Sequence, residues 1–218
     1  MKNGVTILLA DDHAMVREML KMRLTAEPGM AVVDTVSDAE QAVTQAVRLK
    51  PDIVLMDIDM PGLLCFDAAK TIASRCRRTR IIFVSAFFHD RYIEQALAVG
   101  ASGYVTKAEP PDVLVKAIQT VASGAAYYSP EVQSRIVADA DGPRLAESAH
   151  TRASTLTARE MEVLRYLARG LPKHKIAETM HLSTNTVNRH AYSLMNKLDI
   201  HDRVALTRFA IREGLADA

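Results

Sequence analysis

Residues 53–62, IVLMDIDMPG, combine a short apolar run with an acidic end. The run from Ile53 to Met56 does not alternate between apolar and polar side chains, so both faces of the predicted strand should be covered. Continuous apolar strands of this length are typical of a parallel sheet with helices on both sides. Asp57 follows where the strand ends, which is where such sheets collect their functional side chains.

The same arrangement extends in both directions through residues 1–124. Apolar runs alternate with segments whose apolar residues recur every three to four positions, as at Met15, Met19 and Met22. This order predicts an α/β domain built on a doubly wound, flavodoxin-like, five-stranded parallel sheet. The predicted strands are Val5 to Ala10, Ala31 to Val36, Ile53 to Met56, Ile81 to Ser85 and Gly103 to Thr106.

The pattern changes after residue 124. Residues 125–154 are predicted to be a linker because most of this segment is rich in small and polar residues without a sustained apolar period, although Pro130 to Ala138 could form a short helix. Residues 155–218 show no strand pattern and predict a smaller all-α domain. Its expected helices are Ala158 to Arg169, Lys173 to Met180, Thr184 to Leu198 and Arg203 to Glu213, with a capping box at Thr157 and Glu160 and a cap at Ser183.

Composition and charge restrict the class of protein. The chain has 218 residues, of which 49% are hydrophobic and 24% charged, as expected for soluble domains. No apolar stretch approaches the ~20 residues that a membrane helix needs, and no secretory signal is visible, so we expect a cytoplasmic protein without membrane contact. From Thr155 onward ten Lys and Arg oppose seven Asp and Glu, which weakly favours a nucleic-acid partner for this part.

Chemically active side chains follow four of the five predicted strands. Asp11 and Asp12 follow the first strand, Asp57 the third and Lys107 the fifth, while Ser85 ends the fourth. Parallel strands bring these positions to one edge of the sheet, where crowded carboxylates repel one another unless a cation such as Mg²⁺ lies between them. An aspartate beside Mg²⁺ can attack phosphorus while a lysine ammonium and the metal neutralise the phosphoryl oxygens.

This set of residues resembles the receiver domain of two-component response regulators over residues 4–124. The matching positions are Asp11-Asp12, DIDMPG at 57–62, Ser85-Ala86 and GASGYVTK at 100–107. The resemblance implies that Asp57 accepts a phosphoryl group, which Ser85 and Lys107 contact. It also implies that Tyr104 turns inward when Ser85 moves. The implied magnesium site consists of Asp12, Asp57 and the backbone carbonyl of Asp59, with Asp11 bound through water.

The helices after Leu156 predict a helix-turn-helix with a turn at His181 to Ser183 and a second helix that lies in the major groove of DNA. Apolar residues of that second helix, Val187, Leu194 and Leu198, should be buried. The outward side chains expected to read bases are Asn185, Asn188, Arg189 and Tyr192, and those expected to contact phosphates are Lys173, Lys175, Thr184, Thr186 and Lys197.

The segment from Leu156 to Leu215 resembles the LuxR-type helix-turn-helix of the NarL/FixJ group of response regulators. Its signature includes LT at 156–157, RE at 159–160, TV at 186–187 and KL at 197–198. Asn188 stands where the family usually has lysine. The resemblance implies a phosphorylation-dependent transcriptional regulator that receives its phosphoryl group from a sensor histidine kinase and binds double-stranded DNA as a homodimer. It implies no enzymatic activity beyond the protein's own phosphoryl transfer and dephosphorylation.

Two alternatives stay open at this point. A regulator of the same build could act without phosphorylation, under the control of a ligand or a protein contact. The sequence Asp57-Ile58-Asp59 after an apolar strand is also found in phosphatases with an aspartate nucleophile. That motif normally belongs to the first strand of such enzymes, with a paired acidic motif later, whereas here the acidic pair precedes it.

Overall fold

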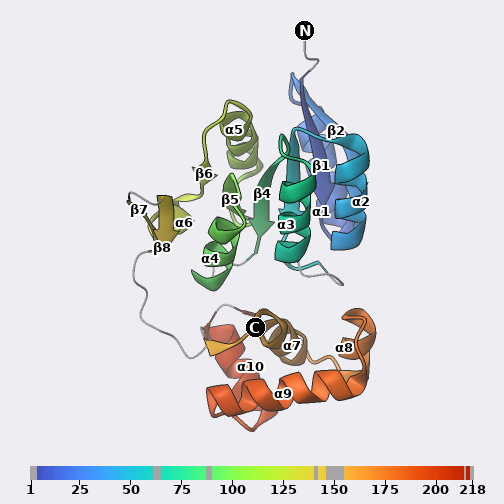
Figure 1. Cartoon of the computed structure of the whole chain (residues 1–218), viewed down its shortest axis with the longest axis vertical. Helices are drawn as coiled ribbons and strands as arrows, with labels where there is room; N and C mark the ends of the chain where they lie inside the picture. Colours follow the sequence, from blue (N-terminus) through green and yellow to red (C-terminus); the bar gives the residue numbers. More distant parts are fainter. Residues whose placement is uncertain are drawn as a thin grey trace. The chain divides into compact units, whose positions relative to one another are not determined.

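The computed structural model describes residues 4–60, 65–86, 90–139, 142–145, 155–213 and 215–216. The chain divides into two compact units, Met1–Ala146 and Glu147–Ala218, and each is described by itself. Figure 1 labels the helices and strands of both.

The first unit contains a parallel sheet with the strand order β2-β1-β3-β4-β5-β6. The order reverses direction after β1, as expected for a doubly wound sheet, and the predicted fold class is confirmed. The bounds are β1 Val5–Ala10, β2 Met30–Val36, β3 Ile53–Asp57, β4 Arg80–Ser85, β5 Gly103–Thr106 and β6 Tyr127–Tyr128.

The predicted count of five strands is too low by one. The two-residue strand β6 extends the sheet, with Tyr127 paired to Gly103 and Tyr128 to Tyr104. A side chain at position 103 would place its Cβ 2.9 Å from the carbonyl oxygen of Tyr127, so the glycine permits this close approach. Two residues are too few to give a periodic signal in the sequence.

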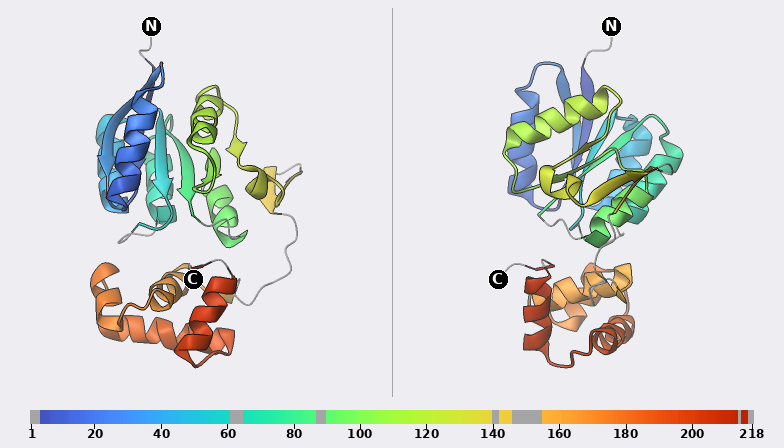
Figure 2. Two further views of the ribbon diagram at one scale, coloured as in Figure 1. Left: turned by 180° about the vertical axis from the view of Figure 1, so that it is seen from behind. Right: turned by 90° about the vertical axis from the view of Figure 1, so that its left-hand side faces the viewer.

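Helices cover both faces of the sheet. Helices α1 and α5 lie side by side on one face, and α2 and α3 pack together on the other (Figure 2). Alternate residues of β1 and β3, such as Ile7 and Leu55, form with Leu24 of α1 and Ile118 of α5 a core without solvent exposure. Each such side chain stabilises the fold by about 1.5–3 kcal/mol. The helix bounds are α1 Ala14–Thr25, α2 Ala39–Leu49, α3 Cys65–Arg75, α4 Asp90–Ala98 and α5 Pro111–Ala122.

The segment predicted as a linker contains regular structure. Helix α6 is shorter than the expected helix and spans Pro130–Gln133, and β7 (Ile136–Asp139) and β8 (Gly142–Leu145) then form an antiparallel hairpin. The hairpin belongs to the first unit, where β8 lies against α4 (Figure 1). Arg135 forms an ion pair with Asp90 at the start of α4. Of the predicted linker, positions 140–141 and 146–154 lie outside the described residues.

The second unit consists of four described helices, α7 Ala158–Ala168, α8 Lys173–Thr179, α9 Thr184–Leu198 and α10 Arg203–Arg212. The capping box at Thr157 and Glu160 and the cap at Ser183 are confirmed. Helix α9 packs against α7 and α8 through the predicted stripe, which also includes Ala191. Among the described helices of the whole chain, none combines the length and the apolar character needed to cross a membrane.

Candidate functional site

The carboxyl ends of β1 and β3 bring acidic side chains together. Ala10 pairs with Met56, so Asp11 and Asp57 follow on neighbouring strands. Both are almost fully buried, with 2% and 1% of their surface exposed. One ligand atom from each of Asp11, Asp12, His13 and Asp57 lies within 4.8 Å of the others. The predicted convergence of the carboxylates is therefore present in the structure.

Lys107 reaches this group from the end of β5. Its backbone N–H donates to the carbonyl oxygen of Ser85 at 2.7 Å, which fixes the start of the loop after the strand. Its Nζ lies 2.7 Å from Oδ2 of Asp11 and 3.0 Å from Oδ2 of Asp57. One ammonium is thus shared by two buried carboxylates, and these carboxylates raise the pKa of Lys107 against the effect of burial.

The pKa of Asp57 reflects opposing influences. Burial raises it, Lys107 lowers it and the negative charge of Asp11 raises it, which leaves the pKa at about 6. Oδ1 of Asp57 is buried and accepts no hydrogen bond within the described part of the chain. A buried carboxylate oxygen without a donor is costly, so the site favours a ligand that supplies positive charge or hydrogen bonds.

Ser85 and Tyr104 form the neighbouring part of the site on β4 and β5. Both are fully buried, and the Tyr104 hydroxyl is hydrogen-bonded to Ser85. Burial raises the pKa of Tyr104 well above its usual range, so the phenol is neutral. The ring lies beside Phe83, with centroids 6.4 Å apart. Tyr104 therefore points inward in this structure, toward Ser85. The receiver-domain resemblance associates the same two residues.

One residue near the acidic pair differs from the expected set. His13 was not predicted, yet its Nδ1 lies 2.7 Å from Oδ1 of Asp12. Its position directly after two aspartates was the available signal. The carboxylate of Asp59 is absent from the group of converging ligand atoms around Asp57. The predicted role of Asp59 concerns its backbone carbonyl, and stays a prediction.

The donor set fits Mg²⁺. Three aspartates offer the carboxylate oxygens that this ion prefers, whereas His13 offers a nitrogen that suits it less well. The unpartnered Oδ1 of Asp57 supplies a ligand atom that no hydrogen bond occupies within the described residues.

Helix α9 presents a polar face. Among the side chains expected to read bases, Asn185, Asn188 and Arg189 are exposed, and Tyr192 is 69% exposed. The apolar stripe on the other face holds the helix against α7 and α8. A large exposed aromatic beside amides and a guanidinium is suited to a polar, flat surface such as the edges of DNA bases.

The side chains expected to contact phosphates occupy different environments. Lys173 and Thr184 are exposed at the starts of α8 and α9. Lys175 forms an exposed pair with Glu178, and Thr186 interacts with Ser183 at the start of α9. Lys197 donates to Oε2 of the buried Glu160 at 2.7 Å. The ammonium of Lys197 therefore holds α9 to α7, and its phosphate contact stays a prediction.

Comparisons with known families follow the same division into two parts. The family described as response regulator receiver domain matches residues 7–119, and the family described as bacterial regulatory proteins, luxR family, matches residues 154–210. The chain belongs to the response regulator family. This confirms the resemblance on which the sequence prediction was based.

Full-length relatives show that the response regulator match extends over the whole chain. The transcriptional regulatory protein YxjL of Bacillus subtilis (strain 168) is 32% identical over 214 residues, which covers 98% of both chains. The response regulator UvrY of Escherichia coli (strain K12) is also 32% identical over 214 residues, covering 98% of this chain and 97% of UvrY. This response regulator is therefore a transcriptional regulator of the two-component type.

A solved structure supports the fold of this response regulator. RcsB of Salmonella typhimurium, 23% identical, matches it with a TM-score of 0.72 over 97% of this chain and 99% of RcsB. At this level of identity the match concerns the fold alone.

Proposed function

We propose that Asp57 of this response regulator accepts a phosphoryl group and that its phosphorylation controls the binding of α9 to DNA. The observation that carries the proposal is the position of Lys107, whose ammonium contacts both Asp57 and Asp11 at the carboxyl ends of the strands. A nucleophilic carboxylate beside a fixed cation is what phosphoryl transfer requires.

In the proposed reaction, a carboxylate oxygen of Asp57 forms a bond to phosphorus while the bond from phosphorus to the donor breaks. The donor's leaving group keeps the electron pair of the broken bond; for a sensor histidine kinase this is the phosphorylated imidazole nitrogen. Lys107 balances the charge on the phosphoryl oxygens. The hydroxyl of Ser85 then donates to one phosphoryl oxygen, and Tyr104 follows Ser85 because the two are hydrogen-bonded.

Three aspartates, Asp11, Asp12 and Asp57, together with the backbone carbonyl of Asp59, would hold Mg²⁺ in this proposal. The bound ion supplies positive charge that neutralises the phosphoryl oxygens and lowers the repulsion between carboxylates. The pair of Asp11 with Lys107 restrains both side chains on the same side of Asp57.

The proposed DNA surface consists of the exposed polar face of α9 with the starts of α8 and α9. Asn185, Asn188, Arg189 and Tyr192 face the bases, and Lys173, Lys175, Thr184 and Thr186 face the phosphates. RcsB, whose fold the chain shares, has conformational dynamism for DNA interaction. A homodimer would place two such helices on two half-sites of double-stranded DNA, which raises affinity by doubling the phosphate contacts.

The proposed cellular setting is the cytoplasm, where DNA and the catalytic part of a sensor histidine kinase are both available. The protein acts there as a substrate of the kinase and as a DNA-binding switch, with its own phosphoryl transfer and dephosphorylation as its only chemistry. The phosphatase alternative is less well supported, because Asp57 ends the third strand and the acidic pair follows the first.

Phosphorylation by acetyl phosphate tests the chemical half of the proposal. With Mg²⁺ present, intact-protein mass spectrometry should detect one added phosphoryl group, and chelation of Mg²⁺ by EDTA should prevent it. Asp57→Asn should abolish the product, whereas Asp67→Asn, which removes an exposed carboxylate on α3, should not. Modification of Asp57→Asn to the same extent as the wild type would refute the assignment.

A further inference from the structure

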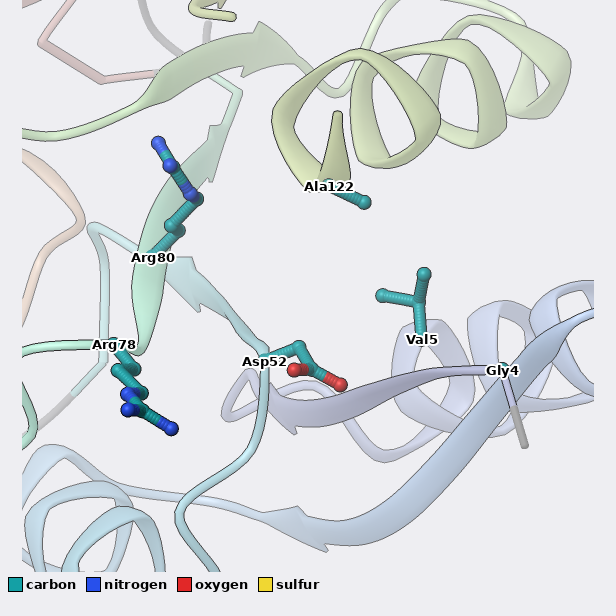
Figure 3. A pocket seen from close by; sticks show the side chains of 6 residues that line it. All are labelled: Gly4, Val5, Asp52, Arg78, Arg80 and Ala122. Carbon is teal, nitrogen blue, oxygen red and sulfur yellow. The ribbon is translucent and has the colours of Figure 1, made fainter. Parts of the chain in front are cut away.

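A cavity lies at the end of the sheet opposite Asp57. Its volume is about 430 Å³, within the size range of small-molecule sites. The residues that line it precede or begin strands β1, β3 and β4, or end α5, so parallel topology places them at the amino ends of the strands. They are Gly4, Val5, Asp52, Arg78, Arg80 and Ala122 (Figure 3).

Two guanidinium groups give this cavity its character. Arg78 and Arg80 are both exposed, and neither guanidinium group forms a hydrogen bond or an ion pair within the described residues. They belong to a run that also contains Arg75 and Arg77, and no acidic residue interrupts it. Figure 3 shows Arg78 and Arg80 on the β4 side of the cavity, with Val5 and Ala122 lining the other side.

Asp52, the acidic side chain in the lining, is engaged in holding strands together. Its Oδ2 accepts hydrogen bonds from the backbone N–H of Thr6 at 3.0 Å and from the Thr6 hydroxyl at 2.7 Å. Its carbonyl oxygen accepts from the backbone N–H of Arg80 at 2.9 Å. Asp52 therefore fixes the floor of the cavity and joins β1, β3 and β4, while the two arginines keep an excess of positive charge.

A glycine at position 124 keeps the surroundings of Arg80 open. Gly124, with a φ of 108°, follows α5, and a Cβ there would have Arg80 Nη2 as its nearest neighbour, at 4.0 Å. At Gly4, with a φ of 83°, a Cβ would approach the carbonyl oxygen of Gly29 to 2.6 Å, so this part of the rim is backbone alone. No side chain at position 124 fills the space beside the Arg80 guanidinium group.

We propose that this cavity binds a small phosphate-bearing molecule of about mononucleotide size. Arginine forks form paired hydrogen bonds with phosphate, and one phosphate offers three acceptor oxygens. Arg78 and Arg80 point in opposite directions in Figure 3, and the proposal requires these two exposed side chains to turn toward a shared phosphate. A carboxylate offers two oxygens and is satisfied by one fork. Val5 and Ala122 add an apolar wall that suits the organic part of such a molecule. The site lies at the end of the sheet opposite Asp57 and does not depend on the phosphorylation of that residue.

Titration of the full-length protein with pyrophosphate and with adenosine monophosphate, followed by NMR of the arginine Nε–H groups at constant ionic strength, tests the assignment. Saturable shifts of the Arg78 and Arg80 signals are expected with both ligands. Arg78→Gln and Arg80→Gln should each weaken binding at least 10-fold. Arg77→Gln removes the same charge one residue away, outside the cavity lining. This variant should weaken binding less than 2-fold.

Three results would overturn the proposal. The first is the absence of saturable binding of either phosphate compound. The second is an equal loss of affinity in Arg77→Gln, which would show general attraction to a basic surface. The third is binding of a dicarboxylate such as succinate in preference to pyrophosphate. Because Gln keeps most of the side-chain length at these exposed positions, the variants should fold, and their backbone amide spectra provide the check.

Discussion

Lys107 Nζ lies between two buried carboxylates, 3.0 Å from Oδ2 of Asp57 and 2.7 Å from Oδ2 of Asp11. The loop that carries this lysine is tied to the end of β4 through the hydrogen bond from its backbone N–H to Ser85. The cation is therefore positioned by the sheet itself, beside the residue proposed as nucleophile. Mechanistic predictions about Asp57 depend on this arrangement.

Replacement of Lys107 by glutamine should slow both the gain and the loss of the phosphoryl group by at least 10-fold. The ammonium balances the charge on the transferring phosphoryl oxygens in both directions, so its removal raises both barriers. Rates of phosphorylation by acetyl phosphate and of spontaneous dephosphorylation provide the measurement. Lys70→Gln, an exposed change on α3, is the matched control and should leave both rates unchanged. Unaltered rates in Lys107→Gln would remove this lysine from the mechanism.

The ionisation of Glu160 should make the stability of the second unit depend on pH. Burial raises the pKa of its carboxyl, but hydrogen bonds from Lys197, Ser193 and Thr157 outweigh this and lower the pKa to about 2. Because the folded-state pKa lies below the unfolded value of 4.5, the stabilisation is fully present above pH 4.5 and is lost as the pH falls toward 2. It amounts to at most on the order of 3 kcal/mol.

Glu160→Gln should therefore lower the free energy of unfolding of the second unit at pH 7 by roughly 1–3 kcal/mol. The difference from the wild type should shrink below pH 4. Urea denaturation, with amide exchange in α9 as the local measurement, tests both statements. Glu178→Gln removes an exposed pair with Lys175 and should have no measurable effect. A difference that stays constant down to pH 3 would contradict the proposed ionisation of Glu160.

Arg189 is predicted to discriminate between DNA sequences. Arg189→Ala should weaken binding to DNA fragments selected by the wild type by roughly 10- to 100-fold, which corresponds to about 1–3 kcal/mol for a base contact. Binding to random DNA should change much less. Arg208→Ala removes the same charge from an exposed site on α10. Electrophoretic mobility shifts at fixed salt compare these proteins, and equal losses in both variants would show that Arg189 contributes charge alone.

Parallel strands and the acidic pocket were predictable because each depends on local patterns. Ile53 to Met56 is a continuous apolar run, and Asp11, Asp57 and Lys107 follow such runs directly. Parallel pairing then brings the carboxyl ends of the strands together, and this does not depend on the conformation of the loops. The sequence was therefore sufficient to predict that these side chains converge. The structure adds that Lys107 is shared between two carboxylates.

Other features depend on contacts between distant residues or on very short segments. The pairing of Lys197 with Glu160 joins two helices, and nothing in the periodicity of α9 predicts this contact. The hairpin of β7 and β8 contains a run of only three apolar residues, Ile136 to Ala138, and its surroundings have the composition of a linker. Short strands gain stability from their neighbours, here helix α4, and composition does not reveal such neighbours.

The affinity of the full-length protein for wild-type-selected DNA should be measured with and without beryllofluoride in the presence of Mg²⁺, because this comparison shows whether Asp57 controls the binding of α9 to DNA. Beryllofluoride mimics the phosphoryl group on an aspartate. Control of α9 by Asp57 predicts at least 10-fold tighter binding with the mimic, and no change in Asp57→Asn. Equal affinity with and without the mimic in the wild type, or the same tightening in Asp57→Asn, would contradict control of α9 by Asp57 and favour a regulator that acts without phosphorylation.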